Sequence, residues 1–226
     1  MKKYLFNAGC IAFVFLASSF WLPGCEDHMG PGEKYNPREA AKKKAAFDKE
    51  ILAAIDEMMK EMRAAPMTKD PDLDFAYMMI EHHTGGIAVS DIELKYGMHA
   101  EALALGRKTK EGNQASKERL EAFIAAHGDP VPTPEMEHMQ FMKEMEEGMQ
   151  EMEKMLKNWP RTIDADYDFA EVMSRHHMGA IEMSEMELEF GKDETARKEA
   201  QMIIDESKKE IMELRAFQKE HGKPVL

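Results

Sequence analysis

The second half of this 226-residue sequence repeats the first half without a gap, at an offset of 94 residues. The most specific unit of the repeat is Met-x-x-His-His-x-Gly, which begins at Met79 and again at Met173. The other matches are Asp74-Phe75-Ala76 with Asp168-Phe169-Ala170, Ile87 with Ile181, Glu93-Leu94 with Glu187-Leu188, Gly97 with Gly191, Phe123 with Phe217, and His127-Gly128 with His221-Gly222. Two copies of one unit predict an approximate two-fold axis, across which equivalent residues face each other.

Each copy reads as three helices. They are expected over about residues 37–65, 72–97 and 99–127 in the first copy, and over about 134–158, 166–191 and 193–221 in the second. Pro66 and Pro160 end the first helix of each copy, because proline cannot continue a helix. Aspartates near the starts and glycines just past the ends of the other helices are typical cap residues. Nothing in between alternates with the period of two that indicates a strand.

Amphipathic helices of this length, joined by short turns, bury their apolar stripes best in an antiparallel bundle. We therefore predict an all-α fold, an antiparallel helical bundle built from two tandem repeats of three helices. The repeats are placed at 37–130 and 131–226, packing together as one bundle.

The first residues of the chain indicate export. Lys2 and Lys3 precede an apolar run over 11–22, which is shorter than the roughly 20 residues that span a bilayer. The run ends in Leu22-Pro23-Gly24-Cys25, which resembles the bacterial lipobox. We predict a lipoprotein signal peptide at 1–24, lipidation of Cys25 and a tether at 25–36. The protein would then lie in the cell envelope, anchored at the periplasmic or extracytoplasmic face of a membrane; an uncleaved anchor and a plain secreted protein are the alternatives.

Cysteine content and charge exclude several classes of protein. Cys10 and Cys25 are the two cysteines, so the mature domain has neither a disulfide nor an internal thiolate ligand. The formal net charge is −13 and becomes −15 without Lys2 and Lys3, which disfavours nucleic acid as a partner. The unusual component is methionine, with 22 residues, which serves either as flexible core filler or as a soft thioether ligand.

The repeated unit brings methionine and histidine together. One turn separates the methionine from both histidines, so the side chains share one side of a helix. The predicted metal ligands are Met79, His82, His83, Met173, His176 and His177. Adjacent histidines diverge by about 100° around a helix, and the sequence leaves open which of each pair faces inward. Thioether with imidazole suits Cu(I) and imidazole with carboxylate suits Cu(II), so we expect copper, with Cu(I) favoured.

A second methionine-rich stretch lies in the fourth expected helix. Its spacing of three and four predicts a buried stripe of His138, Met142, Met145, Met149, Met152 and Leu156. The first copy has Asp48, Ile51, Ile55, Met58 and Met62 at the positions equivalent to the last five, which favours core packing. Met136 and Met139 lie off this stripe, and together with His138 they form an alternative soft-metal site. Glu93 and Glu187, further along the histidine helices, are expected as surface or inter-helix salt partners, with support of the imidazoles as the alternative.

Two other function classes are alternatives. A ferritin-like metal-dependent oxidase needs Glu-x-x-His on two helices, but the only instance is Glu135 to His138, and Met79 and Met173 stand where the motif wants glutamate. A structural or partner-binding helical module would use the methionines as an adaptable surface, without metal. No Ser-His-Asp set, phosphate loop or paired-carboxylate motif stands out, so no enzymatic activity is predicted.

The segments Met79–Ile87 and Met173–Ile181, each followed by Glu-Leu, an aromatic residue and glycine, resemble the domain of unknown function 305 family. The resemblance implies a ferritin-like bundle, export to the envelope and copper binding linked to copper tolerance, as in the CopM-like periplasmic members. Thr84 replaces the usual Gln or Met, and Gly86 the usual Ala. The first site is therefore expected to differ from the second, whose additional methionines are Met178, Met183 and Met186.

The prediction from sequence is a copper-binding lipoprotein of the cell envelope that buffers or sequesters copper. Its expected partners are copper ions and, through Cys25, a membrane. A homo-oligomer and other copper-handling proteins are the open alternatives for protein partners.

Overall fold

The structure, a computed structural model, describes residues 36–222. The predicted signal peptide at 1–24, Cys25 and nearly all of the tether at 25–36 lie outside the described residues. Over residues 36–222, no helix is both long and apolar enough to cross a membrane.

The described chain consists of helices and short loops, without a strand, which confirms the predicted all-α fold. The helices are α1 (Pro37–Ala64), α2 (Pro71–Tyr96), α3 (Ala100–His127), α4 (Glu135–Lys157), α5 (Ala165–Phe190) and α6 (Glu194–His221). Their bounds lie within one residue of those predicted. The first three helices form one repeat and the last three the other.

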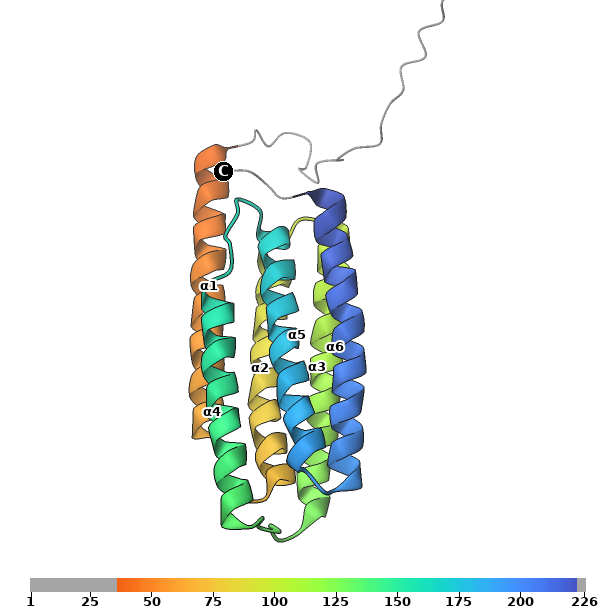
Figure 1. Ribbon diagram of the computed structural model, residues 1–226. Helices are drawn as coiled ribbons and strands as arrows, with labels where there is room; N and C mark the ends of the chain where they lie inside the picture. Colours follow the sequence, from red (N-terminus) through yellow and green to blue (C-terminus); the bar gives the residue numbers. More distant parts are fainter. Residues whose placement is uncertain (1–35, 223–226) are drawn as a thin grey trace, which may run out of the picture. The chain divides into compact units, whose positions relative to one another are not determined.

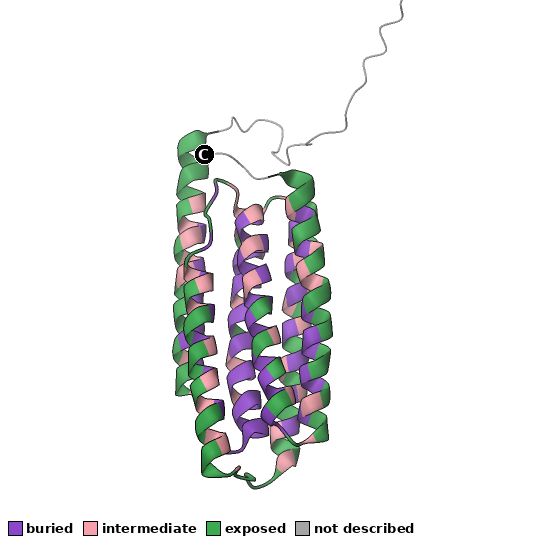
Figure 2. Ribbon diagram, viewed as in Figure 1, coloured by how far each residue is buried: buried purple, intermediate pink, exposed green. Residues whose placement is uncertain are grey.

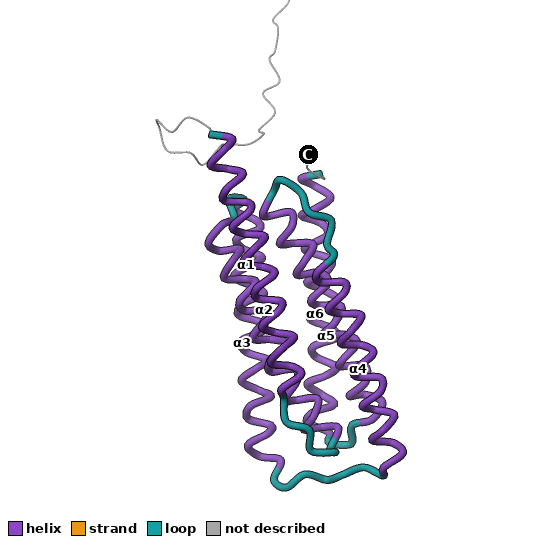
Figure 3. The backbone as a smooth tube through the Cα atoms, turned by 90° about the vertical axis from the view of Figure 1, so that its left-hand side faces the viewer, coloured by secondary structure: helices purple, strands orange, loops and turns teal. Residues whose placement is uncertain are grey.

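The central pair of the bundle is α2 and α5, which run antiparallel and pack against each other (Figures 1 and 3). On one side α1 packs on α2, α4 packs on α5, and α1 contacts α4. On the other side α3 packs on α2, α6 packs on α5, and α3 contacts α6. The central helices are therefore buried along most of their length, as the purple ribbons of Figure 2 show.

Local capping explains where the helices begin. Asn36 and Asp70 each accept a hydrogen bond from the backbone N–H two residues on, and a proline follows each of them as the first helical residue. Asp164 caps α5 by accepting from the N–H of Tyr167, and Asp193 caps α6 by accepting from the N–H groups of Thr195 and Ala196. Such caps satisfy N–H groups that have no partner inside the helix.

The glycines at the helix ends serve two different purposes. Gly128 and Gly222 follow α3 and α6 with φ of +86° and +69°, a conformation that favours glycine. Gly97 and Gly191 follow α2 and α5 with ordinary negative φ. A Cβ at Gly97 would lie 2.4 Å from Glu93 Oε1, and one at Gly191 would lie 2.1 Å from Glu187 Oε1. These two glycines make room for a buried carboxyl group.

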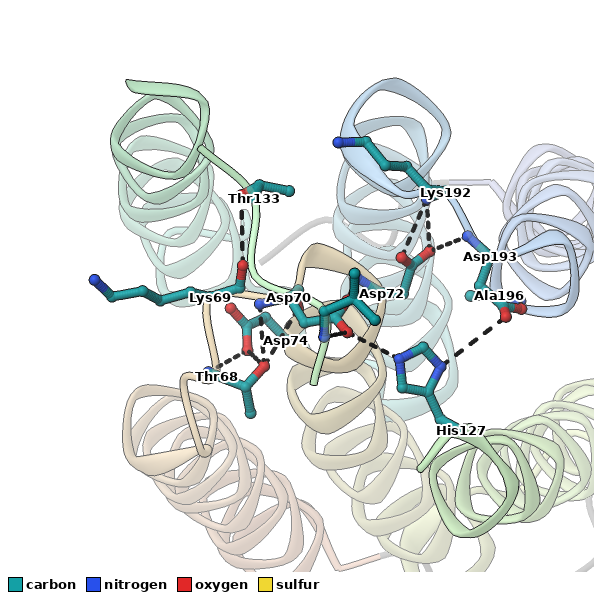
Figure 4. Close-up of polar contacts among 11 residues, drawn as sticks. Thr68, Lys69, Asp70, Asp72, Asp74, His127, Thr133, Lys192, Asp193 and Ala196 are labelled. Carbon is teal, nitrogen blue, oxygen red and sulfur yellow. Dashed lines mark hydrogen bonds and ion pairs between the residues drawn. The ribbon is translucent and has the colours of Figure 1, made fainter. Parts of the chain in front are cut away.

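Two aspartates connect the repeats to each other. The Asp72 carboxylate of α2 accepts hydrogen bonds from the backbone N–H groups of Lys192 and Asp193, at the start of α6 (Figure 4). Asp166 of α5 accepts the equivalent bonds from Met98 and His99, at the start of α3. Each repeat thus holds the residues that lead into the third helix of the other repeat, where a negative charge also interacts favourably with the helix dipole.

A second symmetric pair of aspartates holds the loops before α2 and α5. Asp74 accepts hydrogen bonds from the backbone N–H and hydroxyl of Thr68 (Figure 4), and Asp168 does the same for Thr162. Lys44 of α1 forms an ion pair with Asp168, with 2.8 Å between Nζ and Oδ2. These contacts fix the entry of both central helices.

Glu93 and Glu187 are fully buried, so their interpretation as surface residues is wrong. Burial, followed by the neighbouring carboxylate of Asp166, raises the pKa of Glu93 to about 10. Burial, followed by Asp72, raises the pKa of Glu187 to about 10 as well. Both glutamates are therefore protonated at neutral pH.

Replacement of Asp72 by alanine removes the cap that joins the first repeat to α6. We expect Asp72→Ala to lower the free energy of unfolding by about 2 kcal/mol, because two N–H groups lose their acceptor in a water-poor setting. Urea titration followed by circular dichroism measures the loss. The exposed, helical Asp205 provides a control, since Asp205→Ala should change stability by less than about 0.5 kcal/mol. Equal losses in the two variants would contradict the role of Asp72.

The buried glutamates predict an unusual dependence of stability on pH. The pKa of each glutamate is about 10 in the folded state and 4.5 in the unfolded state. Between these two pH values, the folded state therefore retains two protons that the unfolded state has already released. Their contribution to stability is complete below pH 4.5 and falls as pH rises, by at most roughly 1.4 kcal/mol per pH unit for each group.

Glu93→Gln/Glu187→Gln should flatten this fall, because glutamine is neutral at every pH. We expect the variant to be more stable than the wild type at pH 9, as measured by urea titrations from pH 6 to 9. The matched control is Glu101→Gln/Glu111→Gln, at exposed positions of α3. If Glu93→Gln/Glu187→Gln leaves the slope of the free energy of unfolding against pH unchanged, these glutamates are ionised in the folded protein.

Candidate metal centre

The imidazole rings of His82 and His176 stack on each other near the midpoints of α2 and α5. Their centroids lie 3.9 Å apart, with 27° between the ring planes. Both residues are fully buried. The approximate two-fold axis relates α2 to α5, and equivalent histidines therefore meet where the two helices cross it. This answers the question that the sequence left open: His82 and His176 are the inward histidines.

Three nitrogen atoms of this stacked pair have no hydrogen-bond partner. His176 donates from Nε2 to the backbone carbonyl oxygen of His82, over 3.0 Å, so its Nδ1 carries the free lone pair. Neither Nδ1 nor Nε2 of His82 has a partner. A buried polar atom without a partner costs free energy, so such atoms point to a role that packing does not explain.

Burial keeps the histidines neutral. It is the main cause that lowers the pKa of His176 to about 3 and the pKa of His82 well below its usual value, and neighbouring histidines lower both further. Neutral imidazole is the form that binds metal ions. These histidines are therefore ready to bind a cation without first losing a proton.

His83 and His177 point the other way, toward α3 and α6. His83 Nδ1 lies 2.8 Å from Asn113 Oδ1, and its Nε2 lies 2.9 Å from Ser116 Oγ. His177 Nε2 lies 2.9 Å from Glu210 Oε2. Both histidines line a small cavity of about 30 Å³ between these helices. Because both nitrogens of His83 already have partners, His83 is less available as a ligand than His82.

Methionine sulfurs flank the stacked pair from α1 and α4. A Cβ at Gly179 would lie 2.3 Å from Met152 Sδ and 3.3 Å from His82 Nε2. The sulfur of Met152 and the free nitrogen of His82 therefore converge on the same glycine. In the other repeat, a Cβ at Gly85 would lie 2.3 Å from Met58 Sδ. Glycine at these positions lets a thioether approach each central helix.

The two repeats differ at the residue after these glycines. A Cβ at Gly86 would lie 2.7 Å from His176 Cε1, so the absence of a side chain lets the His176 ring approach α2. The equivalent position in α5 is Ala180. The two inward histidines also differ in hydrogen bonding. Both ring nitrogens of His82 lack a partner, whereas His176 lacks one only at Nδ1.

The remaining predicted ligands differ in burial. Met79 and Met173 are fully buried one turn before the inward histidines, and Met183 is buried further along α5. Met178 is exposed.

Met136, His138 and Met139 do not share one face of α4. Met136 and Met139 are exposed, with 85% and 62% of their surface accessible. His138 Nδ1 is buried without a partner. Burial is the main cause that raises the pKa of Asp74, and His138 lies close enough to oppose that rise. His138 occupies the position equivalent to Lys44, which pairs with Asp168 in the other repeat.

Across residues 36–222, no group of three or more His, Cys, Asp or Glu side chains is arranged to hold a metal ion. The candidate centre instead combines imidazole nitrogen with thioether sulfur, from His82, His176 and Met152. Sequence reasoning assigned Met152 and Met58 to the core. The sequence signal that could have placed these methionines near the histidine helices is the glycine that both copies have, at 85 and 179, because such a glycine indicates close approach of a neighbouring side chain.

Nuclear magnetic resonance can test the neutral state of the buried histidines. We expect the Cε1–H resonances of His82, His83 and His176 to show no protonation between pH 8 and pH 5, because burial holds each pKa far below 6.5. Since the unfolded histidines bind protons below pH 6.5, acid should also destabilise the fold through these groups. Titration of all three near pH 6.5 in the folded protein would contradict their burial; the acid-unfolded protein serves as the reference.

Comparisons with known proteins agree with this architecture. The family described as domain of unknown function (DUF305) matches residues 32–124 and 72–218. A DUF305 fragment from Deinococcus radiodurans is 20% identical, with a TM-score of 0.50, covering 69% of this chain and 99% of that one. A DUF305 protein from Streptomyces coelicolor that is predicted to be secreted is 18% identical, with a TM-score of 0.53, covering 71% and 99%. No curated protein matches the chain.

The two family matches overlap over residues 72–124, as suits a chain whose halves resemble each other. The two solved structures share the fold. The CopM-like, copper-binding subtype stays a prediction. From the extent of the family match, this chain belongs to the DUF305 family.

Proposed function

We propose that this protein binds copper outside the cytoplasm and buffers or sequesters it as Cu(I), through the stacked histidines His82 and His176 and the Met152 thioether. The observation that carries this proposal is the convergence of an unpartnered buried nitrogen and a sulfur on Gly179. Ligands of this softness favour Cu(I) over zinc, magnesium or iron. Cu(II) is the alternative oxidation state, held where imidazole and carboxylate meet at His177 and Glu210.

The carboxylates near the central helices support a soft rather than a hard cation. Asp72, Asp74, Asp166 and Asp168 are engaged in backbone and hydroxyl hydrogen bonds at the helix ends. Glu93 and Glu187 are protonated at neutral pH and lie beside those aspartates rather than beside the histidines. The donors left around the bundle centre are imidazole and thioether groups, which bind Cu(I) without adding charge.

Storage rather than turnover is part of the proposal. A catalytic metal site keeps an open position for substrate, whereas His82 and His176 are fully buried between their helices. An oxidase would consume oxygen when given Cu(I) or Fe(II), and such activity would contradict this part of the proposal.

The location outside the cytoplasm rests on two observations. The first residues have the order of a lipoprotein signal peptide, with Cys25 as the proposed lipidated residue. A structural neighbour from Streptomyces coelicolor is predicted to be secreted. Attachment to a membrane through Cys25 is proposed on the sequence alone. Copper ions are the proposed ligand; a second copy of the chain and other copper-handling proteins are candidate protein partners.

Competition for Cu(I) against a chromogenic chelator tests the proposal. We expect His82→Leu/His176→Leu to weaken Cu(I) binding at least a hundredfold, because both inward imidazoles are lost while leucine fills the buried space. His83→Gln/His177→Gln should weaken binding less than tenfold, since these side chains face α3 and α6 instead. Thermal unfolding without metal verifies that both variants are folded.

The possible outcomes separate three cases. Failure of the wild type to compete at micromolar protein would overturn the copper proposal and leave a helical module without metal. Loss of binding in the His83/His177 variant alone would move the site to the cavity near Glu210. Equal losses in both variants would indicate that all four imidazoles are required.

A further inference from the structure

At six equivalent positions, the interface between α4 and α5 has methionine where the interface between α1 and α2 mostly has other residues. On the α4/α5 side the residues are Met142, Met145, Met149, Met152, Met183 and Met186. The equivalent residues on the α1/α2 side are Asp48, Ile51, Ile55, Met58, Val89 and Ile92. We call the first set, together with Met139, the methionine seam. Because α1/α2 packs as well with isoleucine and valine, packing alone does not account for the methionines.

The seam runs from the surface to the candidate metal centre. Met139, near the start of α4, is 62% exposed, and Met142 is partly buried. Met145 and Met152 are each 1% exposed, and Met149 is 7% exposed. The seam ends at Met152, whose sulfur faces Gly179 together with His82 Nε2. The seam therefore passes from an exposed methionine to buried ones, and it is buried from Met145 to Met152.

Helix α5 contributes sulfur to the same interface. The Met186 methyl group would lie 3.7 Å from a Cβ at Gly148, between Met145 and Met149 in sequence. Met183 is buried one turn closer to Gly179. At the outer end, the rings of Phe141 and Phe190 pack edge to face, with centroids 5.6 Å apart. Thioethers from both helices thus line the interior of the seam.

The spacing of the α4 methionines suits stepwise transfer. Successive members are three or four residues apart, which is about 5 Å along a helix, and Met139 to Met152 covers about 20 Å. Thioethers are neutral, flexible and polarizable, so a soft monovalent cation can exchange between them without a large change in solvation. A hard cation would gain no comparable ligand inside the bundle.

Negative charge gathers beside the seam. Glu146, Glu147, Glu151 and Glu182 are exposed on α4 and α5, and two of them, Glu147 and Glu151, pair with Lys143 and Lys154. Burial and the neighbouring carboxylates of Glu151 and Glu185 raise the pKa of Glu182, which shows how closely these groups crowd. A field of this sign raises the local concentration of cations next to the interface.

We infer that the methionine seam is the route by which a soft monovalent cation travels from the exposed start of α4 to His82. The route is one-sided, because isoleucine, valine and aspartate occupy the equivalent interface of the other repeat. The inference rests on the proposed function and specifies which face of the bundle receives the ion. It assigns Met139, Met142, Met145 and Met149 to the rate of loading, and His82, His176 and Met152 to the affinity.

Loading kinetics test the inference with Ag(I), a soft cation that does not change oxidation state, and with Cu(I) delivered from a chromogenic chelator. The test variant is Met145→Ile/Met149→Ile, which introduces the residues that the other repeat has at Ile51 and Ile55. We expect loading to slow at least tenfold, while the equilibrium affinity stays within threefold of the wild type.

The matched control is Met62→Leu/Met78→Val, which also removes two fully buried methionines and introduces the residues of the other repeat, Leu156 and Val172. These positions lie outside the seam, so loading should be unchanged. Swaps among apolar residues of similar volume are those that cores tolerate best. If Met145→Ile/Met149→Ile does not fold, Met145→Leu/Met149→Leu replaces it.

The outcomes distinguish the route from the site. If the wild type binds neither ion, the proposed function fails. If the wild type binds and the seam variant loads at the wild-type rate, the route is overturned and the function stands. A loss of affinity as large as the loss of rate would overturn the route as well, because the seam methionines would then be ligands of the resting site.

Discussion

The structure depends on burying two helices that carry charged and polar groups. Helices α2 and α5 contact neighbours on three sides, yet they contain aspartates, glutamates and histidines along their buried faces. Buried polar groups are stable only with partners or without charge. The molecule uses both solutions. The aspartates bind backbone N–H groups at the helix ends, whereas the glutamates stay protonated and the central histidines stay neutral.

This division leaves the middle of the bundle different from its ends. Near the ends, the buried aspartates hold loops and the starts of helices, and the buried oxygens of Glu93 and Glu187, although without hydrogen-bond partners, belong to protonated, neutral carboxyl groups. In the middle, the free nitrogens of His82 and His176 have no such role, and the sulfur of Met152 faces one of them. A protein that needed only stability would be better served by apolar residues at these positions, as studies of buried polar groups indicate. The unmet hydrogen-bonding capacity is therefore best understood as capacity for a ligand.

Much of the fold could be predicted from the sequence because its signals are local. Proline, aspartate and glycine mark the helix ends, and the repeat implied the symmetry. The inward histidine could not be predicted, because α2 and α5 have neighbours on both flanks and either side of the helix could hold a buried imidazole. The burial of Glu93 and Glu187 was missed for a related reason. Each is accommodated by a glycine four residues later and an aspartate of the other repeat, and only the packed structure brings these together.

The reciprocal caps made by Asp72 and Asp166 bear on how such a chain folds. The residues that lead into α3 and α6 are each held by an aspartate of the other repeat, so the two halves depend on each other for these contacts. Unfolding should then be a single cooperative transition of both halves. A chain of half the length could still satisfy every cap if two copies paired about a true two-fold axis, exchanging aspartates as the repeats do. A homodimer of three-helix subunits, later joined into one chain, is the simplest assembly that would have required the same contacts.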